Sequence, residues 1–143
     1  MIMNFDDVHD GAVVGQAVLQ VNKAEENTLP SGAPIINVSY LITEAEPQGE
    51  KEVDVSGTEF VNHTVFLPQN QDPAGKARMK KKMFMQFLKA HGITPDGNID
   101  TSEAVSVLNN EQPEVQAYLS EDDYAKKNRG IIQTKIARFI TPE

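Results

Sequence analysis

Eleven of the thirteen Lys and Arg residues lie in two segments that contain no Asp or Glu. The first segment, residues 76–94, carries six of these cations, and the second, residues 124–142, carries five. Ammonium and guanidinium groups bind phosphate oxygens, so the two segments indicate nucleic acid as a ligand. The competing interpretation is a solvated basic helix whose charge merely balances an acidic sheet.

The rest of the chain is strongly acidic. Residues 1–75 contain twelve acidic and two basic residues, a charge of 2 − 12 = −10, and the whole chain carries −8. Such segregation can attract a polyanion locally while the net charge keeps the protein soluble.

Aromatic side chains are expected on the solvent-facing side of three predicted strands. If Val61, Val65 and Leu67 face the core, Phe60 and Phe66 face outward. The same alternation places Tyr118 outward near residues 115–119. In the last strand, Ile132, Ile136 and Ile140 are expected inside, and Gln133, Lys135 and Phe139 outside. Exposed rings can stack on the bases of a single strand, although a helix could instead bury them as ordinary core.

The sequence gives little support for a metal site or a catalytic site. Asp96, Asn98 and Asp100 match the first ligands of a calcium loop, but Thr101 and Val107 replace the required Gly and Glu. The three His residues form no close pair, and no nucleophile, phosphate-loop or dinucleotide motif is present. We therefore expect no enzyme, no metal and no cofactor.

The elements that position these residues follow from periodicity. Alternating apolar residues predict strands over 13–25, 34–46, 53–67, 113–120 and 131–140. Residues 76–92 predict an amphipathic helix whose apolar stripe includes Met79, Met83 and Phe87, ending at Gly92. Asp100 and Glu103 suggest a capping box for a short helix through Leu108.

Three strands, a helical segment and two strands are the element order of a five-stranded OB-type barrel, which is mainly β with helices between strands 3 and 4. A generic α+β sandwich is the alternative. In an OB fold, the connection between strands 4 and 5 often binds oligonucleotides. Here it is the polar segment 121–130, which is expected to be a loop that places Tyr124 beside Lys126, Lys127 and Arg129.

Composition fits a single domain over residues 1–143, with residues 1–12 as a flexible segment. The chain is 39% hydrophobic and contains no Cys, so disulfides are excluded. No secretory signal or membrane-spanning stretch is evident, which predicts a cytoplasmic protein.

Several short motifs resemble a family of phage and prophage proteins, formerly of unknown function, that are encoded beside replication and recombination genes. The likeness covers nearly the whole chain and rests on MNFDDV at 3–8, FMQFLKAHGI at 84–93, and IARFI at 136–140 with Tyr124 and Asn128 before it. It implies an OB-fold single-stranded DNA-binding protein in phage DNA metabolism, located in the host cytoplasm. The positions that match the family pattern are Tyr124, Asn128, Arg129, Arg138 and Phe139. Many such binders end in an acidic tail, whereas this sequence ends RFITPE.

We therefore expect a non-enzymatic protein that coats single-stranded DNA by stacking on bases and contacting phosphates. The alternative is an accessory protein-interaction module of a phage recombination system that does not bind DNA. Contacts with phage replication or recombination proteins, and homo-oligomers, remain open. The expected nucleic-acid-binding residues are Phe60, Phe66, Lys76, Lys80, Lys81, Tyr118, Tyr124, Lys126, Lys127, Asn128, Arg129, Lys135, Arg138 and Phe139.

Overall fold

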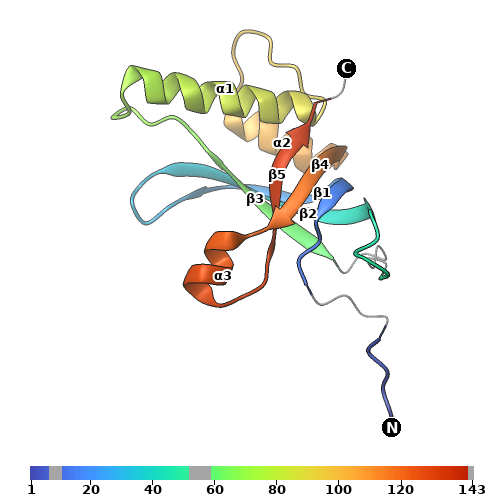
Figure 1. Ribbon diagram of the computed structural model, residues 1–143. Coiled ribbons are helices and arrows are strands. Elements are labelled where there is room, and N and C mark those ends of the chain that lie inside the picture. Colours follow the sequence, from blue (N-terminus) through green and yellow to red (C-terminus); the bar gives the residue numbers. More distant parts are fainter. Residues whose placement is uncertain (7–10, 52–58, 142–143) are drawn as a thin grey trace.

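Five antiparallel strands form a sheet that curls into a half-barrel (Figure 1). The computed structural model describes residues 1–6, 11–51 and 59–141, so part of the predicted strand 53–67 lies outside the described residues. The strand order is β3-β2-β1-β4-β5. The strands are β1 (Gly15–Thr28), β2 (Pro34–Ala45), β3 (Phe60–Phe66), β4 (Glu114–Glu121) and β5 (Thr134–Ile140).

Two helices connect β3 to β4, as predicted. They are α1 (Ala74–Ala90) and α2 (Thr101–Glu111), and the Asp100 side chain caps α2 by accepting a hydrogen bond from the Ser102 N–H at 2.9 Å. No helix in the described part of the chain is long and apolar enough to span a membrane.

The predicted loop between β4 and β5 is wrong, because it forms a third helix, α3 (Asp123–Arg129). Asp122 caps its first turn by accepting from the Ala125 N–H at 3.1 Å, and Gly130 ends it in the left-handed conformation at φ 65°. Lys126, Lys127 and Arg129 occupy its last turn, where cations offset the partial negative charge of a helix C-terminus. Local start and stop signals therefore outweigh the polar composition.

The two edge strands of the half-barrel, β3 and β5, lie near each other. No backbone ladder joins them within the residues that the structure describes. The sheet is therefore curled and open along this seam, and α1 contacts both edge strands there.

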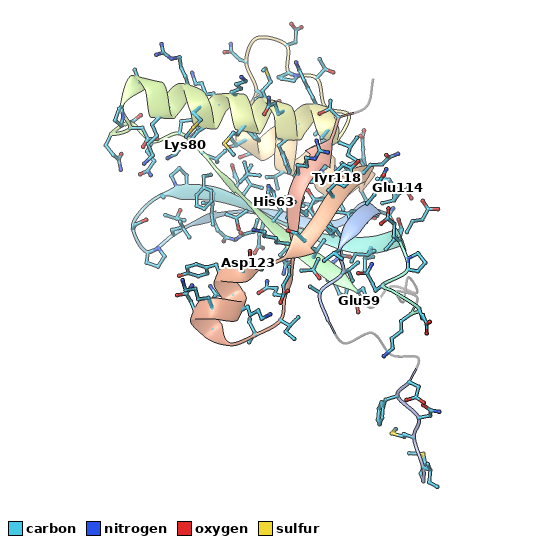
Figure 2. All side chains as sticks on the ribbon, in the orientation of Figure 1. Glu59, His63, Lys80, Glu114, Tyr118 and Asp123 are labelled. Atoms are coloured by element: carbon cyan, nitrogen blue, oxygen red, sulfur yellow. The ribbon has the colours of Figure 1, made fainter. Side chains whose placement is uncertain are left out.

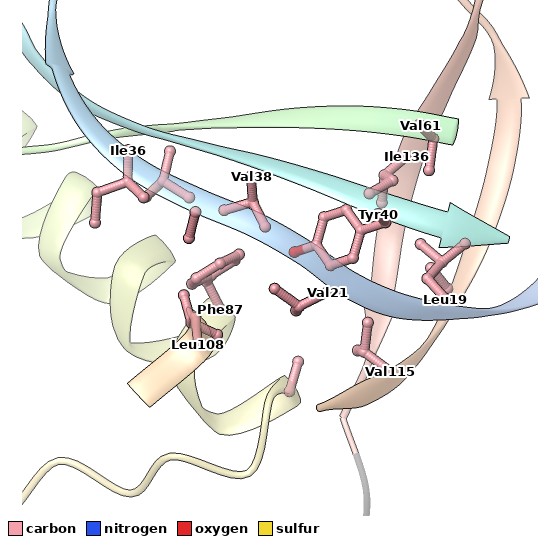
Figure 3. Close-up of a cluster of buried hydrophobic side chains, with 14 of the residues drawn as sticks. Leu19, Val21, Ile36, Val38, Tyr40, Val61, Phe87, Leu108, Val115 and Ile136 are labelled. Atoms are coloured by element: carbon pink, nitrogen blue, oxygen red, sulfur yellow. The ribbon is translucent and has the colours of Figure 1, made fainter. Parts of the chain in front are cut away.

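The inner face of the sheet carries the core, drawn in Figure 3. The predicted inward residues Val61, Val65 and Leu67 are buried, and so are Val115, Ala117 and Leu119 on β4. Tyr40 is fully buried, as expected of an aromatic on the apolar face of β2. The alternation of β3 also leaves Phe60 and Phe66 exposed, as predicted.

The predicted outward position of Phe139 is wrong. Arg138 pairs with Tyr118 and Ile136 pairs with Leu119, so Ala137 is an extra residue that forms a bulge in β5. Beyond the bulge the alternation is reversed, and Phe139 packs against the core while Ile136 stays buried. Ile132, expected on the core face, precedes β5 and is exposed.

One amide side chain of α2, that of Asn109, makes two hydrogen bonds to the backbone of β1. Strand β4 pairs with β1 only as far as Gln20, so the backbone of Ala24 lies beyond this ladder. The Asn109 Oδ1 accepts from the Ala24 N–H, and the Asn109 Nδ2 donates to the Ala24 carbonyl, both at 2.8 Å. The side chain thus takes the place of a neighbouring strand.

We expect the Asn109→Asp substitution to lower the free energy of unfolding by about 1–3 kcal/mol, because a carboxylate cannot donate to the Ala24 carbonyl. Urea denaturation measures this change. Asn110→Asp is the matched control, since Asn110 is exposed like Asn109 but bonds only within α2, to the Ser106 side chain at 3.3 Å. Equal losses in the two variants would contradict the role assigned to Asn109.

Candidate nucleic-acid interface

A groove of about 970 Å³ lies between α1 and the open seam of the sheet. We call it the α1 groove. The end of β3 from His63 to Phe66, the end of β5 from Ala137 to Thr141, and the β1–β2 turn at Leu29 and Ala33 border it opposite one side of α1. In Figure 2, Lys80 lies on α1 above the position of His63 on β3.

Large apolar side chains stand exposed in the α1 groove. The exposed fractions are 53% for Phe66, 54% for Met79 and 60% for Met83. The methionines begin the apolar stripe predicted for this helix, but only its C-terminal part, including Phe87, is buried. Exposed apolar side chains that gather in a concave site mark a place where a ligand binds.

Cations supply all the formal charge among the side chains that line the α1 groove. Lys76, Lys80 and Arg138 line it, whereas no acidic side chain of the described residues does so. In a chain of net charge −8, this local excess of positive charge is large. The groove is therefore able to attract an anion at close range.

Asp72, just outside the groove, holds one of these cations. Its carboxylate lies 2.9 Å from the Lys80 Nζ and 4.0 Å from the Lys76 Nζ. The Gln69 N–H and the Lys80 ammonium both donate to Asp72, and these bonds lower the pKa of its carboxyl. The Lys80 side chain is only 12% exposed, whereas that of Lys76 is 56% exposed. Lys76 is therefore better placed to meet a phosphate.

Arg138 covers one of the predicted stacking residues. Its guanidinium carbon lies 4.4 Å from the centre of the Tyr118 ring, in a cation–π contact across β4 and β5. Tyr118 is half-buried as a result, and it does not line the groove. The contact fixes the Arg138 stem at the groove edge.

A cluster of five rings anchors α1, and three of them, His63, Phe87 and Phe139, also line the groove. It contains Tyr40, His63, Phe87, His91 and Phe139, with ring centres 4.2–6.1 Å apart in the neighbouring pairs. The Phe87 carbonyl can only accept, so the proton of neutral His91 lies on Nδ1, which donates to it at 2.7 Å. The His91 Nε2 then accepts from the Tyr40 hydroxyl at 2.6 Å.

Burial sets the protonation of this cluster. It lowers the pKa of His63 to about 4 and that of His91 to about 4, although the bond to the Phe87 carbonyl opposes the shift of His91. Burial also raises the pKa of Tyr40 well above its ordinary value. At neutral pH all three side chains are uncharged, so the charge of the groove comes from Lys and Arg.

Of the predicted binding residues, the structure brings five together in the α1 groove: Phe66, Lys76, Lys80, Arg138 and Phe139. Phe60 lies at the opposite end of β3, and Lys81 points elsewhere on α1. Lys135 is exposed on β5 but does not line the groove. Three distant segments thus meet at one site, as the binding hypothesis requires.

The remaining predicted residues lie on or beside α3, apart from the groove lining. Tyr124 is exposed, and its carbonyl accepts from the Asn128 Nδ2 at 3.0 Å. Lys126 approaches the Glu121 carboxylate at 3.5 Å, while Lys127 and Arg129 are exposed. These cations have a structural role at the helix C-terminus, and their nucleic-acid role remains a prediction.

Met79, Met83 and His63 line the groove but were not predicted as binding residues. The spacing of the methionines made them indistinguishable from core residues. The sequence contains one indication that these methionines are exposed, because Phe84, Phe87 and Leu88 already supply an apolar face for α1. For His63, the alternation of β3 places it inward, but its position beside the open seam depends on tertiary structure.

The sequence matches no protein-family model and no curated protein. Within the described residues, no three His, Asp or Glu side chains gather as potential metal ligands. The site is therefore interpreted from its own geometry.

We expect the protein to lose stability as pH falls from about 6.5 to 4. Unfolded histidines have a pKa near 6.5, so the unfolded chain binds protons that the half-buried His63 ring and the buried His91 ring reject. His91 alone should account for about 2 kcal/mol between pH 7.5 and 5. Urea denaturation across this range measures the slope.

The His63→Gln variant is the control for this pH dependence. It should show a shallower fall in the free energy of unfolding than the unmodified protein, whatever its stability at pH 7.5. A free energy of unfolding that stays constant from pH 7.5 to 5 would contradict the neutral state assigned to both rings.

Proposed function

We propose that this protein is a non-enzymatic, single-stranded DNA-binding protein of the OB type and that the α1 groove is its binding site. The observation that carries the proposal is a groove with exposed apolar side chains, three cations and no acid among its described lining residues, on a chain of charge −8. Single-strand binders combine a cationic track with surfaces on which bases stack.

The sheet supports the OB part of this proposal. In an OB fold, strand 1 pairs with strands 2 and 4, strands 3 and 5 form the closing seam, and a helix connects strands 3 and 4. The order β3-β2-β1-β4-β5, with β3 near β5 and α1 before β4, follows the same pattern. The β1–β2 turn, which borders the groove, is one of the two loops that bind oligonucleotides in such folds.

In the proposed complex, a base stacks on the exposed face of Phe66, and flexible Met79 and Met83 adapt to neighbouring bases. Lys76 and Arg138 contact the phosphates. No base-specific pairing is required, so binding is tolerant of sequence. A role in phage DNA replication or recombination is part of the proposal, and it rests on the resemblance of the short motifs alone.

A protein-interaction module is the second candidate, and the exposed methionines favour it. Methionine-rich apolar grooves also accept peptides, because the unbranched side chain repacks around different partners. Titration of labelled oligo-dT at low salt separates the two functions. Failure to bind at 20–50 mM salt, roughly the range in which phosphate contacts are strongest, would rule out the DNA-binding proposal.

We expect Phe66→Ala to weaken oligo-dT binding by roughly fivefold or more, since a stacked base contributes about 1–3 kcal/mol. Fluorescence anisotropy measures the dissociation constant. Phe60→Ala is the matched control, because Phe60 lies on the same strand with a similar exposure of 47% but outside the groove. Equal effects of the two variants would place the binding site elsewhere.

We expect Lys76→Gln to reduce the salt dependence of binding, because one phosphate contact on a single strand contributes about 0.7 to the slope of log K against log salt. Lys82→Gln removes the same charge from an exposed position on α1 outside the groove and should leave this slope nearly unchanged. If the two variants behave alike, the effect is one of net charge.

A further inference from the structure

The first six residues form an exposed apolar segment. Met1, Ile2, Met3 and Phe5 all have exposed side chains, with exposed fractions of 100% for Ile2 and 67% for Phe5. Four large apolar side chains in five residues are unfavourable in water unless another surface covers them. The segment therefore has the composition of a docking peptide.

The first ten residues are acidic, with three carboxylates against the single α-ammonium of Met1. Asp6 ends the segment, and the sequence continues with Asp7 and Asp10, while the first basic side chain is Lys23. The segment thus combines apolar side chains with carboxylates. It is complementary to the α1 groove, in which Met79, Met83 and Phe66 stand beside Lys76 and Arg138.

We propose that residues 1–6 of one copy of this chain occupy the α1 groove of a second copy. Figure 1 shows the N-terminal segment leading away from the body on the side opposite α1, so within one copy the two surfaces lie apart. The exposure of Ile2 and Phe5 in the single chain agrees with this separation.

The contact joins different surfaces of the two copies. Ile2 and Phe5 insert among Met79, Met83 and Phe66, and the Asp6 carboxylate lies near the cations of the groove edge. Two copies that exchange their segments reciprocally form a closed dimer, whereas one-way exchange continues into a chain of copies. Association by this contact needs no nucleic acid, so it does not rest on the proposed DNA binding.

Sedimentation velocity over a range of protein concentrations, without nucleic acid, tests the proposal. We expect concentration-dependent association of the unmodified chain. The segment variant Ile2→Ser/Phe5→Ser and the groove variant Met79→Gln/Met83→Gln should each weaken it by roughly tenfold or more, because each removes two buried apolar contacts. Met85→Gln is the control, since Met85 is exposed on the same helix outside the groove and should not change association.

Mixing the two variants identifies the contact. The segment variant keeps an intact groove, and the groove variant keeps an intact segment, so an equimolar mixture should form a heterodimer although each variant alone is weakened. Melting temperatures of all variants confirm that the fold is retained. Labelled peptide MIMNFD provides a second readout, because it should bind the segment variant and not the groove variant.

Three results would overturn the proposal. The first is a protein that stays monomeric at all concentrations, and tighter peptide binding by its segment variant would then assign the docking to one copy. The second is association that both variants leave unchanged. The third is a mixture that behaves as the sum of its parts. All of these measurements are made without nucleic acid, so none of them decides whether the groove binds oligo-dT.

Discussion

The hydrogen bond between Tyr40 and His91 is the interaction on which the groove depends. It joins the centre of β2 to the C-terminal end of α1, and the His91 ring in turn contacts Phe87 and Phe139. The buried residues of α1, which are Phe84, Phe87, Leu88 and Ala90, all lie in its C-terminal half, whereas Met79 and Met83 are exposed. An uncharged ring cluster can therefore hold the helix over the open seam at one end while its other end stands clear of the sheet. The same arrangement that fixes the helix also creates the concave surface.

The distribution of charge around this surface explains how an acidic protein can bind an anion. At physiological salt, exposed charges act over about 8 Å, so the distant carboxylates contribute little at the groove. Asp72 is the exception, since it lies beside Lys76 and Lys80, but it orients Lys80 rather than lining the groove. At low salt, where screening is weaker, the net charge of −8 opposes the approach of a polyanion from afar. Local attraction combined with distant repulsion favours a ligand that fits the groove over one that is merely charged.

The sequence predicted the mainly β architecture because the alternation of apolar and polar residues along each strand indicates which side faces the core. Alternation failed in β5, where the bulge at Ala137 reversed the direction of Phe139, and no residue type there marks a bulge. Helix α3 was not predicted either. The sequence contains its capping residue Asp122 and its terminal Gly130, but the polar composition of the segment led to the prediction of a loop. Part of the site was predictable, because charge and exposed aromatics are sequence properties. The groove itself was not, since it arises where β3, α1 and β5 meet.

If the α1 groove accepts one occupant at a time, the two proposed activities are coupled. A single strand and the N-terminal segment of a neighbouring copy both present apolar faces and negative charge to the same cations. Each therefore lowers the apparent affinity of the groove for the other, by the same factor in both directions. A segment released from one groove by a strand remains tethered to its own copy, where it is available to a free groove nearby. A copy whose own groove holds a strand can therefore still contact a neighbouring copy through its segment, provided that the neighbour's groove is free.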